Sequence, residues 1–76
     1  SAWIQCQTST CIAIHWYQQK ENKIKRIFYY YRSNSIYDDG FSKTKFSSEV
    51  RNNIYFLVIQ DINTEDEGIY YCACWD

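Results

Sequence analysis

Four of the 76 residues in this chain are cysteines, and all four lie close to its ends. Cys6 and Cys11 are near the start, Cys72 and Cys74 are near the end, and most of the chain lies between the two pairs. An even number of cysteines at this density is typical of chains that form disulfides outside the cytosol. Four cysteines allow three pairings, and their spacing alone leaves all three open.

A structural zinc site is the rival interpretation of the same four residues. Such sites use cysteine pairs separated by two to four residues on tight turns. Cys6 and Cys11 just meet that spacing, but a single residue separates Cys72 from Cys74, in a segment with the pattern of a strand. We therefore expect disulfides, with no metal and no other cofactor.

The chain is so short that a disulfide matters to whether it folds. A domain of this size buries only about 60% of the surface of its unfolded chain and usually needs a staple or a partner. Its apolar fraction of 46% is that of a globular core, so we expect one ordered domain. A net charge of −1 predicts no nucleic-acid partner, and no apolar run is long enough for direct membrane insertion.

Apolar and polar residues alternate along most of the sequence, which is the pattern of half-buried strands. We expect Leu57 and Ile59 to face inward, continued by Ile62. No stretch has the period of a helix, so the sequence predicts an all-β sandwich or barrel. The expected strands cover residues 2–7, 12–19, 26–31, 45–48, 54–59 and 69–74, with loops or turns at 8–10, 20–23, 33–35, 38–40, 51–53 and 63–68.

A tryptophan and a tyrosine stand at informative distances from two of the cysteines. Trp16 follows Cys6, and residues 66–72 read Asp-Glu-Gly-Ile-Tyr-Tyr-Cys, ending at Cys72. This Cys…Trp…Asp-x-Gly-x-Tyr-x-Cys pattern resembles that of the immunoglobulin variable domain, and the likeness covers nearly the whole chain. It implies a V-type β-sandwich with Greek-key connections, in which a Cys6–Cys72 disulfide crosses the core beneath Trp16.

The resemblance also assigns structural roles and domain boundaries. It implies that Tyr70 forms a tyrosine corner and that Lys45 and Asp66 form an ion pair at the base of the sandwich. A disulfide closing a loop of this length is worth about 4 kcal/mol in the chain-entropy model. Residues 1–76 are expected to be a single partial domain lacking the first and last strands. They would run from the B strand through the F strand to the start of the third hypervariable loop.

Cys11 and Cys74 are expected at one end of this sandwich, in the first and third hypervariable loops. They are candidates for a second disulfide between those loops. Two free thiols, or bonds to residues outside this fragment, are the alternatives, because a bridge needs Cα atoms within about 7 Å.

Further details resemble a T-cell receptor gamma-chain variable region. They are Ile-His-Trp-Tyr at residues 14–17, Tyr-Tyr before Ser-Asn-Ser at 30–35, Arg-Asn-Asn at 51–53, and the final residues 70–76. An antibody light chain shares Trp-Tyr-Gln-Gln and Tyr-Tyr-Cys with this chain. A light-chain-like domain, or another immunoglobulin-superfamily adhesion or recognition module, is therefore the alternative.

The gamma-chain resemblance implies an antigen-recognition domain on the extracellular face of the plasma membrane, with its anchor outside this fragment. The expected partners are a delta-chain variable domain, signalling CD3 subunits through regions outside this fragment, and a protein or presented antigen. An enzyme is not expected. The single histidine, His15, lies beside Trp16 on a strand, and no nucleophile or phosphate-binding loop accompanies it.

Two sets of surface residues carry the expected binding. Tyr17, Gln19 and Tyr71 are expected to face outward from the strands that variable domains use to pair, as an interface with an apolar centre. Tyrosine and tryptophan beside small polar residues match the chemistry of antigen-binding loops. The expected antigen contacts are Thr8, Ser9, Thr10, Ala13, Tyr31, Ser33, Asn34, Ser35, Tyr37 and Trp75.

Overall fold

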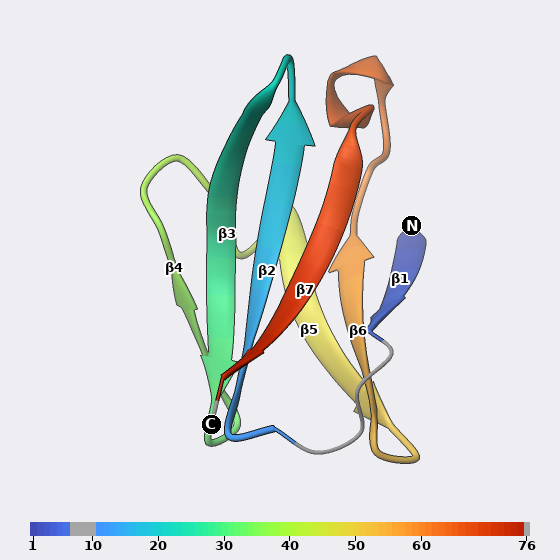
Figure 1. Ribbon diagram of the computed structural model, residues 1–76. Coiled ribbons are helices and arrows are strands. Elements are labelled where there is room, and N and C mark those ends of the chain that lie inside the picture. The colour runs from blue at the N-terminus through green and yellow to red at the C-terminus, as the bar shows by residue number, and fades with distance from the viewer. Residues whose placement is uncertain (7–10, 76) are drawn as a thin grey trace.

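Two antiparallel β-sheets pack face to face in the computed structural model, which describes residues 1–6 and 11–75 (Figure 1). One sheet has the strand order β1-β6-β5, and the other has the order β4-β3-β2-β7. The described part contains no α-helix, and a single 3₁₀ turn, η1, covers Thr64–Asp66. The strands are β1 (Ala2–Cys6), β2 (Ala13–Lys20), β3 (Lys23–Tyr31), β4 (Asn34–Tyr37), β5 (Phe46–Arg51), β6 (Ile54–Ile59) and β7 (Ile69–Trp75).

The six expected strands are all present, and β4 is an additional one. Residues 33–35 were expected to form a loop, but a two-residue turn at Arg32 and Ser33 leads directly into β4. Both turn residues have positive φ angles, 49° and 64°, which suits the twist of a tight hairpin. The sandwich therefore has the extra strand pair, β3 and β4, of a V-type domain.

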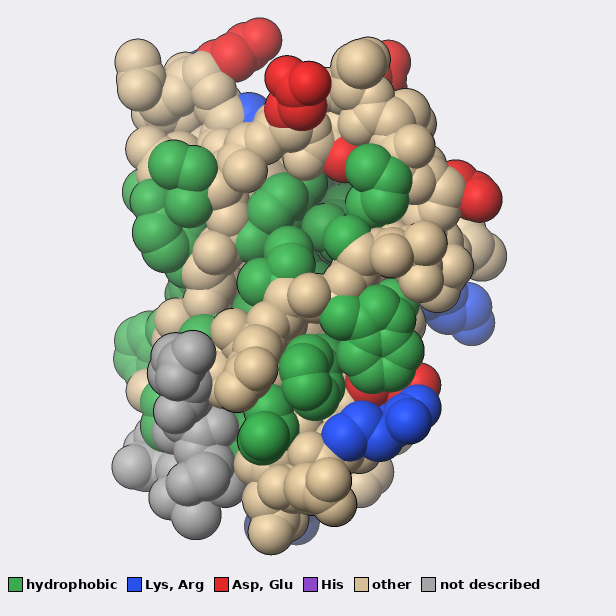
Figure 2. Space-filling view, turned by 90° about the vertical axis from the view of Figure 1, so that its right-hand side faces the viewer, with side chains coloured by type: hydrophobic (Ala, Val, Ile, Leu, Met, Phe, Trp, Pro, Cys, Tyr) green, Lys and Arg blue, Asp and Glu red, His purple; other side chains and the backbone are tan. Residues whose placement is uncertain are grey.

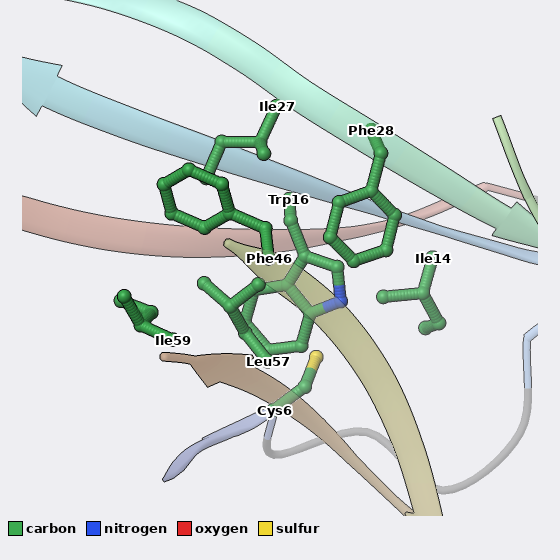
Figure 3. Packing of buried hydrophobic residues seen from close by; sticks show 8 residues of the cluster. All are labelled: Cys6, Ile14, Trp16, Ile27, Phe28, Phe46, Leu57 and Ile59. Atoms are coloured by element: carbon green, nitrogen blue, oxygen red, sulfur yellow. The ribbon is translucent and has the colours of Figure 1, made fainter. Parts of the chain in front are cut away.

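Side chains from both sheets meet around the indole of Trp16 (Figure 3). Two-residue alternation along β2 buries Ile14 and Trp16 on one face. Leu57 and Ile59 of β6 lie in the same core, as predicted. The other core residues are Cys6, Ile27, Phe28 and Phe46.

The expectation for Ile62 was wrong. Strand β6 ends at Ile59, and Asp61 has a positive φ of 46°, so the alternation stops before Ile62. Half of the Ile62 surface is exposed, at 50%.

A β-bulge in β3 fixes which residues of that strand reach the core. Trp16 pairs with Phe28 and Tyr17 pairs with Arg26, so Ile27 is the extra residue of the bulge. Because of it, consecutive residues Ile27 and Phe28 are both fully buried. Arg26 consequently lies on the opposite, outer face of the sheet.

The Cys6–Cys72 disulfide joins β1 of one sheet to β7 of the other, with 5.8 Å between the Cα atoms. The hydroxyl of Tyr70 donates a 2.7 Å hydrogen bond to the carbonyl oxygen of Asp66, which is the geometry of a tyrosine corner. Lys45 Nζ lies 2.7 Å from Asp66 Oδ2, so the expected ion pair is also present.

Strands β1 and β7 are edge strands on the same side of the sandwich. Figure 2 views the molecule from this side and shows hydrophobic side chains in the hollow between the two sheets. Within the described residues, neither strand has a hydrogen-bonded neighbour on its outer side.

Candidate functional site

The outer face of the β4-β3-β2-β7 sheet carries the residues expected to contact a partner chain. Tyr17 and Tyr71 lie opposite each other on β2 and β7. The Tyr71 hydroxyl donates a 2.5 Å hydrogen bond to Oε1 of Gln19, which lies two residues beyond Tyr17 along β2. The structure therefore brings all three predicted residues together.

Two isoleucines that the sequence did not single out extend this outer face. Ile24 pairs with Gln19 on one side, Ile69 pairs with it on the other, and their exposed fractions are 62% and 56%. A shallow, largely apolar pocket of about 300 Å³ lies nearby, lined by Tyr17, Ile24, Tyr71, Cys72 and Ala73. We call the five residues Tyr17, Gln19, Ile24, Ile69 and Tyr71 the apolar sheet face. An exposed apolar surface of this kind marks a site that another molecule covers.

Next to the apolar sheet face lies a polar network that the sequence did not predict. Arg26 binds both carboxylate oxygens of Asp38, through Nε at 2.6 Å and Nη2 at 3.0 Å. Its Nη1 lies 3.3 Å from Nδ1 of His15. Because Arg26 is always a donor, Nδ1 of His15 accepts this hydrogen bond and must be unprotonated.

Aromatic rings enclose the histidine of this network. The imidazole of His15 stacks on Tyr29 with 5.3 Å between ring centroids. The ring centroid of Trp75, on the neighbouring strand β7, lies 5.1 Å from that of His15. Burial, and then the positive charge of Arg26, lower the pKa of His15. The hydrogen bond from Arg26 lowers the pKa of Asp38. The network is therefore satisfied internally, with a neutral imidazole beside a charged pair.

The loop end of the sandwich holds a second disulfide. Cys11 and Cys74 are bonded, with 5.6 Å between their Cα atoms, so the proposed bridge is present and the free-thiol alternative is wrong. It ties the segment before β2 to the last part of β7. Ala13 pairs with Tyr31 on one side and with Trp75 on the other, which aligns three predicted contact residues across three strands.

The remaining predicted antigen contacts divide into three groups. Thr8, Ser9 and Thr10 lie outside the described residues. Ser33 is in the exposed β3–β4 turn, and Asn34 follows it as the partner of Tyr31. Ser35 pairs with Tyr30 inside β4 rather than lying in a loop.

Tyr37 is placed away from these residues. Its ring packs against Phe28, with 4.8 Å between centroids, and its hydroxyl donates a 2.5 Å hydrogen bond to the carbonyl oxygen of Phe46. These contacts tie Tyr37 to the interior of the sandwich, so it is not part of the exposed loop end. The sequence pattern did not reveal this role, because tyrosine has a polar hydroxyl group and is common on surfaces as well as in cores.

Trp3, whose surroundings the sequence did not explain, packs on the outer face of the other sheet. Its ring meets Phe56 edge to face at 5.5 Å, and the guanidinium of Arg51 lies 5.3 Å from the ring centroid. Among residues 1–6 and 11–75, no group of His, Cys, Asp and Glu side chains is arranged to hold a metal ion. No helix in that same part of the chain is long and apolar enough to cross a membrane.

The whole chain, residues 1–76, matches the family model described as the immunoglobulin V-set domain. It therefore belongs to the immunoglobulin V-set family. It is 37% identical to human T cell receptor gamma variable 5 over 82 residues, an alignment that covers all of this chain and 70% of that protein. Within the V-set family, the chain thus belongs with the T cell receptor gamma variable regions.

Other relatives are consistent with this placement. The chain is 38% identical to human T cell receptor gamma variable 2 over 68 residues, covering 83% of this chain and 57% of that protein. Among solved structures, a marsupial T cell receptor superposes with a TM-score of 0.85 at 31% identity. That superposition covers 99% of this chain and 37% of the receptor chain, so this sequence corresponds to only part of the receptor chain.

Proposed function

We propose that this chain is the ligand-recognition variable domain of a gamma-delta T-cell receptor and that it pairs with a delta-chain variable domain. The apolar sheet face carries the proposal. Its two exposed isoleucines, Ile24 and Ile69, lie beside the tyrosine pair Tyr17 and Tyr71, around an apolar pocket. Burial of such side chains is the main driving force for association of stable domains.

The chemistry of this face favours a partner domain over a small ligand. The pocket is shallow, and the groups around it are aromatic and aliphatic with one amide, that of Gln19. Interfaces between proteins have this composition at their centres, with tyrosine enriched and charge depleted. The neighbouring His15–Arg26–Asp38 network already satisfies its own charges, so a partner need not supply any there.

We propose that ligand contact occurs at the loop end, which the second disulfide ties together. Tyr31 and Trp75 flank Ala13 there, and Ser33 and Asn34 form the adjacent turn and strand start. We also propose Thr8, Ser9 and Thr10, which lie outside the described residues, as ligand contacts. Rigid aromatic area beside small hydrogen-bonding side chains is the chemistry of antigen-binding loops.

The two edge strands support the proposal that the domain is completed by further strands. Exposed strand edges pair readily with other strands, and the hollow between β1 and β7 leaves core side chains visible (Figure 2). A strand beside each edge would cover this side of the sandwich. Residues 1–76 then form the central part of one variable domain.

Two disulfides in a chain of this length support a location outside the cytosol. We place the domain on the extracellular face of the plasma membrane, with its anchor and its contacts to signalling CD3 subunits in other parts of the receptor. This role is binding and involves no catalysis.

Co-expression of the complete chain that carries these residues tests the pairing. We expect it to co-purify with a delta chain of the same organism and not with an antibody heavy chain. Pairing with the heavy chain would instead support a light-chain-like domain, and a stable complex with neither would support an adhesion or recognition module.

A further inference from the structure

A groove of about 560 Å³ opens between the two sheets at the loop end of the sandwich. Ile12 and Tyr30 line it from the β2–β3 side, and Val50 and Tyr55 line it from β5 and β6. The rings of Tyr30 and Tyr55 meet edge to face across the sheets, with 6.1 Å between centroids. Both rings pack on the hydrophobic core, so they close the groove at its inner end.

The groove combines exposed apolar surface with one cation. Ile12 and Val50 are 60% and 38% exposed, although both are aliphatic. Arg32 lies at the rim, where its guanidinium is 5.1 Å from the ring centroid of Tyr31. Within the described residues, no carboxylate lies within ion-pair distance of Arg32, whereas the nearby Arg51 has Glu49 at 3.7 Å.

We propose that this groove is an anchor site for one large apolar side chain of a protein ligand, with a neighbouring carboxylate of that ligand bound by Arg32. The inference rests on the proposed function, since it deepens ligand recognition at the loop end. The size of the groove suits one or two large side chains. Its closed inner end, formed by Tyr30 and Tyr55, favours a side chain over a long acyl chain.

The site is built from residues outside the third loop. Its lining comes from the segments around β2, β3, β5 and β6, and the Cys11–Cys74 disulfide fixes one wall to β7. Recognition at the groove therefore depends on residues of this chain that are independent of whatever follows Trp75.

The test uses a fluorinated dipeptide as probe and the purified ectodomain of the complete receptor chain, assembled with its partner where the two pair. Acetyl-aspartyl-4-fluorophenylalanine amide is titrated by fluorine NMR and compared with the matched asparaginyl probe. We expect the aspartyl probe to bind about fivefold more tightly, because a charge-assisted hydrogen bond to Arg32 is stronger than a neutral one. Arg32→Gln should remove this difference between the probes.

Two further variants, one at Val50 and one at Ile62, distinguish loss of binding at the groove from a general effect of adding a surface charge. Val50→Arg should abolish binding of both probes by filling the groove, whereas Ile62→Arg, at another exposed aliphatic position outside it, should bind like the unmodified chain. Arg32 is exposed in a turn, so its variant gives an independent result if Val50→Arg fails to fold. Decanoate is titrated in the same way, to test whether the groove binds an acyl chain instead of a side chain.

Four outcomes would overturn the proposal: equal binding of the two probes, equal loss of binding in Val50→Arg and Ile62→Arg, tighter binding of decanoate than of the aspartyl probe, or absence of saturable probe binding. Assembly with the delta chain is measured by size-exclusion chromatography on the same samples. A failure of pairing is thereby distinguished from a failure of the groove to bind.

Discussion

Arg26 donates a hydrogen bond from Nη1 to Nδ1 of His15 over 3.3 Å. The contact requires a neutral imidazole, and both burial and the charge of Arg26 lower the pKa of His15. His15 is therefore harder to protonate in the folded chain than in the unfolded chain, where it titrates near pH 6.5, the ordinary value for histidine. Stability should fall as the pH falls through that range, since the unfolded state then binds more protons.

Thermal unfolding at pH 7.5 and pH 5.5 measures this effect. We expect a lower melting temperature at pH 5.5, and a smaller pH difference in His15→Gln, which cannot titrate. Titration of Asp38 does not contribute to the difference between pH 7.5 and pH 5.5. Its pKa is lowered by Arg26, so its contribution is present above its ordinary value near 3.8 and is lost only as the pH falls further. Parallel pH profiles for the two proteins would contradict the assignment.

Removal of either disulfide alone should cost a similar amount of stability. The two bonds close loops of nearly equal length, with sequence separations of 66 and 63, so whichever bond remains still contributes about 4 kcal/mol in the chain-entropy model. In the presence of one bond, the other closes only the short segments between the neighbouring cysteines, worth about 2.5 kcal/mol. Urea unfolding of the Cys6→Ala/Cys72→Ala and Cys11→Ala/Cys74→Ala variants tests this equality. Clearly unequal losses would show that the bridges do not act through chain entropy alone.

Ile24→Lys should weaken pairing with the delta chain without destabilising the domain. The side chain is 62% exposed, so the lysine remains solvated in the isolated chain but places a charge in the apolar sheet face of the pair. Ile62→Lys is the matched control, because Ile62 is 50% exposed and lies outside that face. Co-purified delta chain is measured for each. The same yield from both variants would count against this face as the pairing surface.

Gly68 is needed because a neighbouring strand approaches it closely. A Cβ atom at this position would lie 2.7 Å from the carbonyl oxygen of Gln19, which belongs to the backbone and cannot swing away. Gly68→Ala should therefore cost about 1–3 kcal/mol, as overpacking usually does. It should also disturb the contact between β2 and the start of β7. Denaturant unfolding gives the free energy, and an unchanged midpoint would contradict the steric argument.

The architecture was predictable from the sequence where alternation and the motif coincide. Trp16, Leu57, Ile59 and Tyr70 each stand where a two-residue period or the motif places them, and the structure confirms their positions. Ile62 was mispredicted because alternation contains no information about where a strand ends. The positive φ of Asp61, which ends it, has no strong residue signal.

The candidate surfaces were harder to predict than the core. Ile24 and Ile69 meet around Gln19 only because of the register between three strands, and register is a tertiary property. The same holds for Arg26 and Asp38, which lie 12 residues apart and carry no motif. The expected loops made Cys11 and Cys74 candidates for a disulfide, but the sequence could not give the distance between their Cα atoms, which decides whether the bond can form.

The bulge at Ile27 makes the length of β3 as important as its composition. If β3 paired with β2 without this bulge, Ile27 would lie opposite Tyr17, and every residue from Lys23 to Arg26 would turn to the other face of the strand. The charged Arg26 would then point into the sandwich, and Ile24 would leave the surface that we assign to the partner chain. The one extra residue therefore supports folding and association together, although Ile27 itself belongs only to the core.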